Sequence, residues 1–212
     1  MGIKTKKSNK LMVELQSEVD YTITKIFHLA DIHIRNFIRH SEYDYVFKKT
    51  FDYIKENADE HSLIVLAGDI VHSKNEMTPE LIEMVTKLFN YCVDICPTIV
   101  IAGNHDTNLN NSNRMDALTP IVNAINNTNL HYFKDSGLYE FNNVVFSVYG
   151  ILDDESNWVP ANQIHGDKFK IAMYHGPITS AIMNETSTVD SDIINSHDKN
   201  ISIFDGFDLA LL

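Results

Sequence analysis

The alternation of short apolar runs with amphipathic segments in the first half of the chain constrains its fold more than any other feature. Three apolar runs have the length of buried strands: 23–30, 63–67 and 98–102. Between the first two runs, residues 42–57 place apolar side chains at helical spacing. Thr78 and Pro79 open a second helix, because threonine caps helix N-termini and proline fits the first turn. Two strand–helix–strand units in succession predict an α/β fold with a parallel sheet covered by helices.

The second half of the chain has a different pattern, with fewer helical signals and more turn residues. The remaining segments are predicted in this order: a short helix at 115–125, β-structure at 130–150 with a turn at Asn142 and Asn143, a strand at 169–174, a long surface loop at 179–200 and a buried strand at 207–212. The length of 212 residues suits about one domain. We therefore expect a flexible basic tail over residues 1–20 and a single domain over residues 21–212.

The cellular setting is indicated by what the chain lacks. No apolar stretch approaches the ~20 residues that span a bilayer, and the basic, polar N-terminus has no apolar core typical of a secretory signal. The only cysteines, Cys92 and Cys96, are four residues apart and share the face of a predicted helix. Two buried thiols in a reducing compartment are the favoured interpretation. We expect an intracellular protein with no membrane segment, without distinguishing cytoplasm, nucleus or viral factory.

The charge balance argues against one class of nucleic-acid binding. Seventeen Lys and Arg residues against 29 Asp and Glu residues give a formal net charge of −12, which argues against a broad basic surface for nucleic acid. Local phosphate binding is not excluded, because carboxylates that bind divalent ions reverse the sign of the local field.

Polar residues follow the predicted strands at the points where the strands end, which is where open α/β sheets bind ligands. Asp31 and His33 follow the first strand, and residues two apart in extended chain point the same way. A carboxylate beside an imidazole suits Mn, Fe, Zn or similar ions. By itself this pair is a weak signal, since most such pairs cap elements or lie on surfaces.

The second predicted strand ends in Gly68 and Asp69. Glycine lets the backbone turn sharply and approach a site, and the two oxygens of Asp69 would be able to bridge two cations. An ordinary Gly-Asp turn is about equally probable for this pair alone.

The third predicted strand ends in the strongest single motif, Gly103-Asn104-His105-Asp106. Asn104 offers an amide oxygen to a metal, His105 can donate a proton or hydrogen bond to a phosphate oxygen, and Asp106 would fix the histidine ring. His175, at the end of the strand predicted at 169–174, would more often be a structural histidine if it stood alone.

The four motifs occur in order, and Asp31, Asp69 and Asn104 are 38 and 35 residues apart, each gap fitting one crossover of roughly 30 residues or more. This combination resembles the calcineurin-like metallophosphoesterase family from residue 23 onward. The resemblance implies an αββα sandwich with a dimetal site at the strand ends. It also implies these roles: Asp31 and His33 bind the first metal, Asp69 bridges both metals, Asn104 and His175 bind the second, His105 acts on the leaving group or transition state, and Asp106 supports His105.

Within the family, the chain is most similar to the DNA double-strand-break repair nuclease branch, which includes the SbcD-like nuclease subunit. Residues 70–72 replace the Asp-Arg-Gly expected of protein phosphatases, Asp106 stands where those phosphatases have Glu, and residues 27–47 resemble the nuclease start. This branch implies Mn²⁺ as the metal, with Mg²⁺, Fe²⁺ or Zn²⁺ as alternatives. It further implies DNA as substrate, an SMC-like ATPase subunit as partner and a homodimer, with His72 placing the DNA end.

The sequence departs from the family near its end, where a Gly-x-His motif that supplies one more histidine to each metal is expected. The remaining histidines do not match that motif: His28, His40, His61, His131, His165 and His197. We therefore expect a sandwich with its C-terminal strands missing, either a truncated product of a longer nuclease or a degenerate member with weakened metal binding.

Three functions are carried forward from the sequence. The first is a dimetal phosphodiester hydrolase, a DNA exonuclease or endonuclease of the double-strand-break repair type. The second is another metallophosphoesterase that acts on nucleotides or phosphoproteins. The third is an inactive truncated remnant that serves as a binding module.

Overall fold

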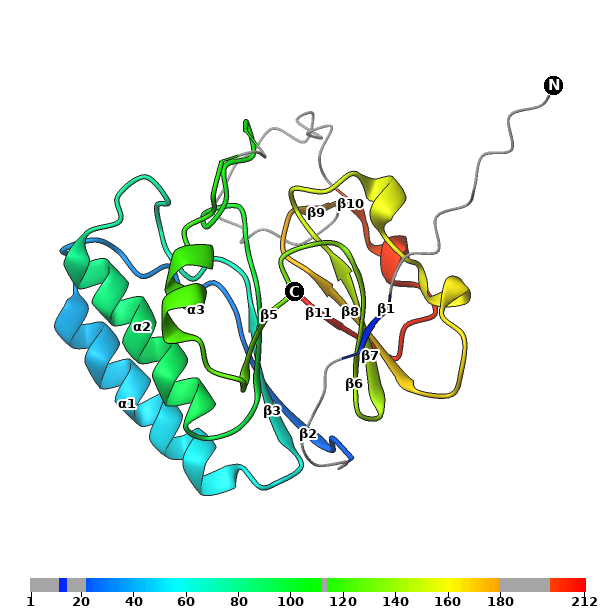
Figure 1. The fold of residues 1–212 in the computed structure, drawn as a ribbon, viewed down its shortest axis with the longest axis horizontal. Coiled ribbons are helices and arrows are strands. Elements are labelled where there is room, and N and C mark those ends of the chain that lie inside the picture. Colours follow the sequence, from blue (N-terminus) through cyan, green and yellow to red (C-terminus); the bar gives the residue numbers. More distant parts are fainter. Residues whose placement is uncertain (1–11, 15–21, 112–113, 180–198) are drawn as a thin grey trace.

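The computed structural model describes residues 12–14, 22–111, 114–179 and 199–212. Within these residues, two β-sheets pack face to face, and α-helices cover the outer face of the first sheet (Figure 1). The first sheet has four parallel strands in the order β2 (Lys25–Leu29), β3 (Ser62–Ala67), β4 (Thr98–Ile101) and β5 (Leu130–Tyr132). Its helices are α1 (His40–Asn57), α2 (Pro79–Val93) and α3 (Thr119–Ile125).

The second sheet is mixed and has five strands in the order β1 (Met12–Glu14), β6 (Gly137–Phe141), β7 (Val144–Tyr149), β8 (Phe169–Tyr174) and β11 (Leu209–Leu211). Only β6 and β7 run antiparallel, joined by the turn predicted at Asn142 and Asn143. A separate short pair joins β9 (Ile178–Thr179) and β10 (Lys199–Asn200). Three 3₁₀ helices complete the described elements: η1 (Glu155–Asn157), η2 (Ala161–Gln163) and η3 (Ile201–Phe204).

This architecture confirms the predicted α/β class and the parallel first sheet. Among the described residues, however, the second sheet is accompanied by the three short 3₁₀ helices instead of an outer layer of α-helices. The layers are therefore helix, sheet and sheet, with short helical turns where an αββα sandwich has its fourth layer.

Strand β3 shows why the apolar runs are continuous. Ile64 and Leu66 pack toward the helices, whereas Leu63, Val65 and Ala67 pack toward the second sheet. All five side chains are fully buried, as expected for a central parallel strand covered on both faces. Two cores on opposite faces of one strand hold the strand ends in a fixed position.

Helix α2 begins as predicted, with Thr78 accepting a hydrogen bond from the Leu81 amide at 3.4 Å and Pro79 in the first turn. The prediction for 115–125 was wrong at its start, because the helix begins only at Thr119. Asp116 explains this difference: its carboxylate accepts hydrogen bonds from the amides of Leu118 and Thr119 at 2.9 and 2.7 Å. These local bonds compete with helix formation in the preceding residues.

Three further expectations are corrected in part. Met12–Glu14 pairs with β6 as strand β1, although residues 1–20 were predicted to be a tail. The rest of that segment, like most of the predicted loop at 179–200, lies outside the described residues. Cys92 and Cys96 are both buried and free, as expected, but α2 ends at Val93, so only Cys92 is helical.

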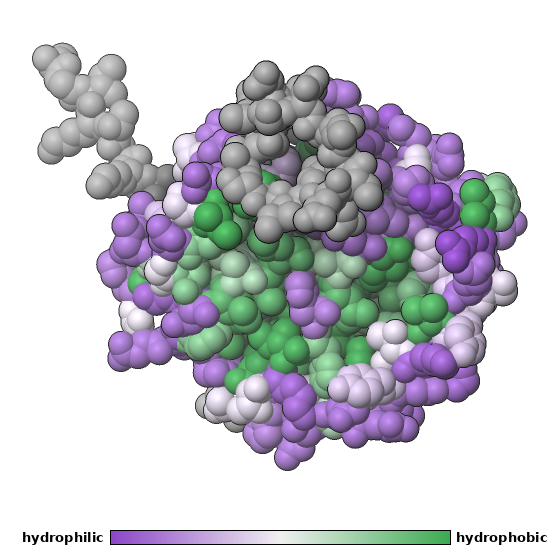
Figure 2. All heavy atoms as spheres, turned by 180° about the vertical axis from the view of Figure 1, so that it is seen from behind, coloured by the Kyte–Doolittle hydropathy of each residue, from purple (hydrophilic) through white to green (hydrophobic). Residues whose placement is uncertain are grey.

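The predicted final strand forms, but it is less buried than its apolar pattern indicated. β11 pairs with β8 at the edge of the second sheet, and of its three residues only Leu211 is buried. β2 is an edge of the first sheet, and the backbone of Leu212 makes a hydrogen bond to His28 on β2. On the side of the molecule shown in Figure 2, apolar residues gather in a broad exposed region. In the described part of the chain, no helix has the length and hydropathy of a membrane span.

Candidate metal centre

The loops that follow β2 and β3 are bonded to each other, which fixes the first two motifs relative to one another. The amide of His33 donates to the carbonyl of Asp69 at 2.8 Å, and the amide of Ile34 donates to the carbonyl of Ile70 at 2.9 Å. The amide of His72 returns a bond to the carbonyl of Ile34 at 2.9 Å. The parallel ladder therefore continues beyond the strand ends and brings both loops to one edge of the sheet.

Three of the predicted metal ligands have left-handed backbone: Asp31 (φ 52°), His33 (φ 50°) and Asp69 (φ 49°). Residues other than glycine rarely adopt this conformation, and strained backbone of this kind clusters at functional sites. The side chains of Asp31 and His33 converge as the sequence predicted, with Asp31 Oδ1 at 3.5 Å from His33 Nε2, and their role as metal ligands stays a prediction. The predicted reason was wrong, because the two residues converge from turns and not from an extended strand.

Asp69 lies at the centre of the group and is only 3% exposed. Its Oδ2 lies 3.4 Å from His33 Nε2, 3.2 Å from His175 Nε2 and 4.0 Å from His105 Nε2. Its Oδ1 accepts a hydrogen bond from the His105 amide at 2.9 Å. Burial opposes ionisation, but the hydrogen bonds from His175 and the His105 amide, with the charges of both histidines, lower the pKa of Asp69. Asp69 is therefore held as an anion.

His175 follows β8 and is buried against the first sheet. Its Nδ1 donates to the carbonyl of Ala67 at 2.7 Å, which leaves Nε2 directed at Asp69 and 3.8 Å from Asp31 Oδ1. A backbone acceptor on one ring nitrogen is the usual way to orient the other nitrogen as a metal ligand. Burial acts to lower the pKa of His175, but the bond to Asp69 and its charge raise it.

The donor set fits divalent ions. Asp31, His33 and Asp69 offer ligand atoms within 4.8 Å of one another, and so do His33, His72 and His105. Among the described residues, Nδ1 of His33 and Nδ1 of His72 are buried without a hydrogen-bond partner. Buried polar atoms usually have partners, so these two nitrogens have capacity for a ligand that the protein itself does not supply. Carboxylates combined with imidazoles suit Mn, Fe or Zn.

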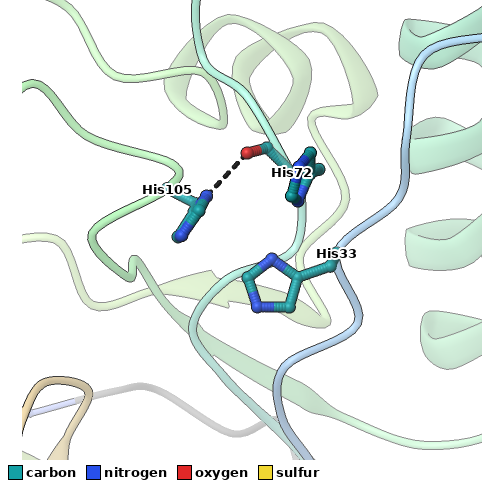
Figure 3. A group of neighbouring side chains, drawn as sticks. All are labelled: His33, His72 and His105. Atoms are coloured by element: carbon teal, nitrogen blue, oxygen red, sulfur yellow. Dashed lines mark hydrogen bonds between the residues drawn. The ribbon is translucent and has the colours of Figure 1, made fainter. Parts of the chain in front are cut away.

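His105 is oriented by the loop that carries His72. Its Nδ1 makes a hydrogen bond of 2.6 Å to the His72 carbonyl, and the two rings are stacked at 5.4 Å (Figure 3). The ring of His33 meets His105 edge-on at 4.7 Å. The side chain of His105 is 37% exposed, so Nε2 is accessible from outside while Nδ1 is fixed.

The predicted role of Asp106 was wrong. Its fully buried carboxylate accepts hydrogen bonds from the amides of Gly103, Ile70 and Val71 at 2.9, 3.2 and 2.9 Å. Burial outweighs these bonds and, together with the charge of Asp69, raises the pKa of Asp106 to about 6. Asp106 therefore ties the loop after β4 to the loop after β3, whereas the His72 carbonyl orients the ring of His105.

Two glycines allow the loops to approach this closely. A Cβ on Gly68 would lie well under 3.0 Å from the ring of His175, and Gly68 also has left-handed backbone (φ 85°). A Cβ on Gly103 would lie well under 3.0 Å from both Asp69 and His175. The glycines that open the second and third motifs are therefore required by packing at the site.

Asn104 stands where two surface cavities meet. Its backbone carbonyl accepts a hydrogen bond from Lys74 Nζ at 3.0 Å. A cavity of about 480 Å³ beside it is lined by His105 and by two cations, Lys74 and Arg114. Sequence reasoning missed both cations. Lys74 could have been found from its position five residues after Asp69. Arg114 gave no sequence signal, because its place at the cavity depends on the path of its loop.

Comparison with known proteins agrees with the geometry. Residues 24–209 match the family described as Calcineurin-like phosphoesterase. The chain is also 43% identical over 183 residues to a protein of Acanthamoeba polyphaga mimivirus named "Uncharacterized protein R555". That match covers 81% of this chain and 13% of the relative, so the chain spans a small part of that protein's length.

The chain belongs to the calcineurin-like phosphoesterase family. Family membership and the candidate ligand groups together suggest metal-dependent hydrolysis of phosphoesters.

Proposed function

We propose that this domain is a nuclease that hydrolyses phosphodiester bonds of DNA with Mn²⁺ as its metal. The observation that carries the proposal is the cavity beside His105, which Lys74 and Arg114 line in a chain of net charge −12. Two cations next to a phosphate-processing centre suit a substrate with further phosphates on either side of the scissile bond.

The chain supplies ligands and a proton donor. Asp31, His33 and Asp69 would hold one ion, and Asp69, Asn104 and His175 would hold the second. When bound, such ions polarise phosphoryl oxygens and lower the pKa of water.

His105 would supply the proton transfer that the ions do not provide. Its Nδ1 donates to the His72 carbonyl, so in the imidazolium form Nε2 carries a second proton, which would pass to the leaving oxygen.

The direct test compares substrates under one set of conditions. The purified chain is incubated with Mn²⁺ and linear duplex DNA, closed circular DNA, a chromogenic phosphodiester or a phosphopeptide. We expect hydrolysis of linear DNA and of the chromogenic diester. Hydrolysis of the phosphopeptide or of small diesters without DNA would favour another phosphoesterase. Hydrolysis of none would favour the binding-module alternative. The SMC-like ATPase partner and the homodimer stay predictions.

Replacing His105 with asparagine should lower kcat by about 10²–10⁴-fold on DNA, the range expected for loss of a general acid. The defect should be much smaller on a nitrophenyl diester, because nitrophenolate leaves without a proton. Steady-state kinetics on both substrates measures the difference. Equal losses on both substrates would contradict a proton-donor role and indicate a general disturbance of the metal centre.

Replacing Arg114 with alanine should raise KM for a DNA oligonucleotide and reduce the slope of log affinity against log salt by about one, as for loss of one phosphate contact. The chromogenic diester, which lacks further phosphates, should be unaffected. Lys87→Ala is the matched control, because Lys87 is half exposed on α2 and pairs with Glu83 away from the cavity. If both variants change DNA binding equally, the cavity has no special role.

A further inference from the structure

Three histidines direct Nε2 toward Asp69, but only two of their rings are oriented by a hydrogen bond from Nδ1. Nδ1 of His175 and Nδ1 of His105 each bond to a backbone carbonyl, at 2.7 and 2.6 Å. Nδ1 of His33 is buried and has no partner in the described part of the chain. Such a bond is the usual means of orienting a metal-binding imidazole. The position of the His33 ring therefore depends on the backbone that carries it.

The backbone of His33 is strained and is held on both sides. Its φ of 50° lies in the left-handed region, which persists at a non-glycine residue only where the surrounding structure holds it. The His33 amide donates to the carbonyl of Asp69 at 2.8 Å, and the His33 carbonyl accepts from the hydroxyl of Tyr43 at 2.6 Å. Tyr43 thus supplies one of the two bonds that fix the backbone of this proposed ligand.

Tyr43 is itself fixed by the first turn of α1. Its ring packs against the helix-side core, with its centroid 5.8 Å from that of Phe47. Three residues earlier, His40 Nε2 makes a hydrogen bond of 2.8 Å to the carbonyl of Arg35. Two side chains of one helical turn therefore bind the carbonyls of residues 33 and 35. The segment that follows the first motif is anchored to the helix that comes after it.

We propose that Tyr43 is a positioning residue of the metal centre, whose hydroxyl holds His33 in the backbone conformation that directs Nε2 toward the first ion. The inference rests on the proposed function, in which His33 binds that ion. Groups that orient a metal ligand account for roughly 10–100-fold in metal affinity. Helix α1 supplies none of the proposed ligands, yet it would contribute to metal binding in this way.

The test removes the hydroxyl and keeps the ring, as Tyr43→Phe does. Calorimetry should show an affinity for Mn²⁺ that is lower by about 10–100-fold. Hydrogen exchange of the His33 amide should be faster in the metal-free chain, because the segment opens more often when its carbonyl is released. Tyr53→Phe, at an exposed tyrosine on α1, is the matched control and should change neither quantity. Unchanged affinity in Tyr43→Phe would overturn the proposal, and so would a loss of affinity without faster exchange at His33.

A second variant separates positioning from a general loss of stability. Phe51→Leu loosens the packing of α1, because Phe51 is 4% exposed in the helix-side core, but it leaves the Tyr43 hydroxyl in place. We expect Phe51→Leu to lower Tm at least as much as Tyr43→Phe and to leave the affinity for Mn²⁺ unchanged. An affinity that falls with Tm in both variants would show that the hydroxyl acts only through stability, and would overturn the proposal.

The outcome is separable from that of the proposed function, since neither measurement needs hydrolysis. Binding of Mn²⁺ that depends on Tyr43, without hydrolysis of any DNA, would leave the positioning role and refute the nuclease. Hydrolysis of DNA with equal affinity for Mn²⁺ in Tyr43→Phe and the parent would leave the nuclease and refute the positioning role. A parent chain that binds no Mn²⁺ would refute both.

Discussion

An asparagine in place of Asp69 is expected to abolish metal-dependent hydrolysis, with kcat/KM reduced by at least ~10³-fold, because residues that only orient metal ligands already account for roughly 10–100-fold. Asparagine keeps the size of the side chain and an oxygen that can accept from the His105 amide. It removes the negative charge that faces His33 and His175. The change therefore isolates the charge of Asp69 from its place in the fold.

Calorimetry measures the binding of Mn²⁺, and thermal unfolding measures the stability of the metal-free chain. Ion binding should be lost, while the melting temperature of the metal-free chain should stay close to that of the parent. Asp52→Asn is the control, because Asp52 is an exposed carboxylate on α1 that pairs with Lys48. A variant at position 69 that retains a tenth of the activity would show that Asp69 is not the bridging ligand.

An alanine in place of Gly103 is expected to have the second large effect, on both stability and metal binding. The added methyl group would overlap Asp69 and His175, and both are fixed by bonds to backbone. Overpacking of this kind costs ~1–3 kcal/mol or more. For a domain of this size, each kcal/mol corresponds to roughly 2–4 °C in Tm. We expect a lower Tm and little further stabilisation when Mn²⁺ is added.

Gly150→Ala provides the graded comparison. Its Cβ would meet Ser136 Oγ, Ser136 N and Asp153 Oδ2 at 3.1, 3.2 and 3.3 Å, contacts that require shifts of only a few tenths of an ångström. Scanning calorimetry with and without Mn²⁺ should show a small loss of Tm and normal stabilisation by the ion in this variant. Normal metal binding by Gly103→Ala would mean that the loops after β3 and β4 are more adaptable than their bonding indicates.

The parallel first sheet and part of the metal centre could be predicted from sequence because both follow from periodicity. Runs such as 63–67 identify covered strands, and parallel strands end at one edge, so Asp31 and Asp69 had to meet. His175 follows a strand of the second sheet, and its place at the centre depends on the packing of the two sheets. The same reasoning failed for Asp106. Adjacency to His105 indicated a side-chain contact, but the two side chains diverge from the turn, and two of the three partner amides belong to residues 35 and 36 positions away.

Features that depend on the path of a loop, or on competition between local hydrogen bonds, could not be predicted from the sequence. Lys74 and Arg114 reach their cavity from irregular segments whose path no periodicity records. The late start of α3 depends on the bonds of Asp116, which are one of several options for an aspartate in that position. An apolar pattern such as 207–212 does not by itself distinguish a central strand from an edge strand, and Leu209 at the sheet edge is 39% exposed.

The bond from His175 to the Ala67 carbonyl joins the second sheet to the first at the metal centre. The other proposed ligands all follow strands of the first sheet, so the first sheet alone would present an incomplete set of donors. His175 and Ala67 are 108 positions apart, so the intervening chain must close into a loop before this contact can form. The complete set of proposed ligands therefore exists only where the two sheets have docked.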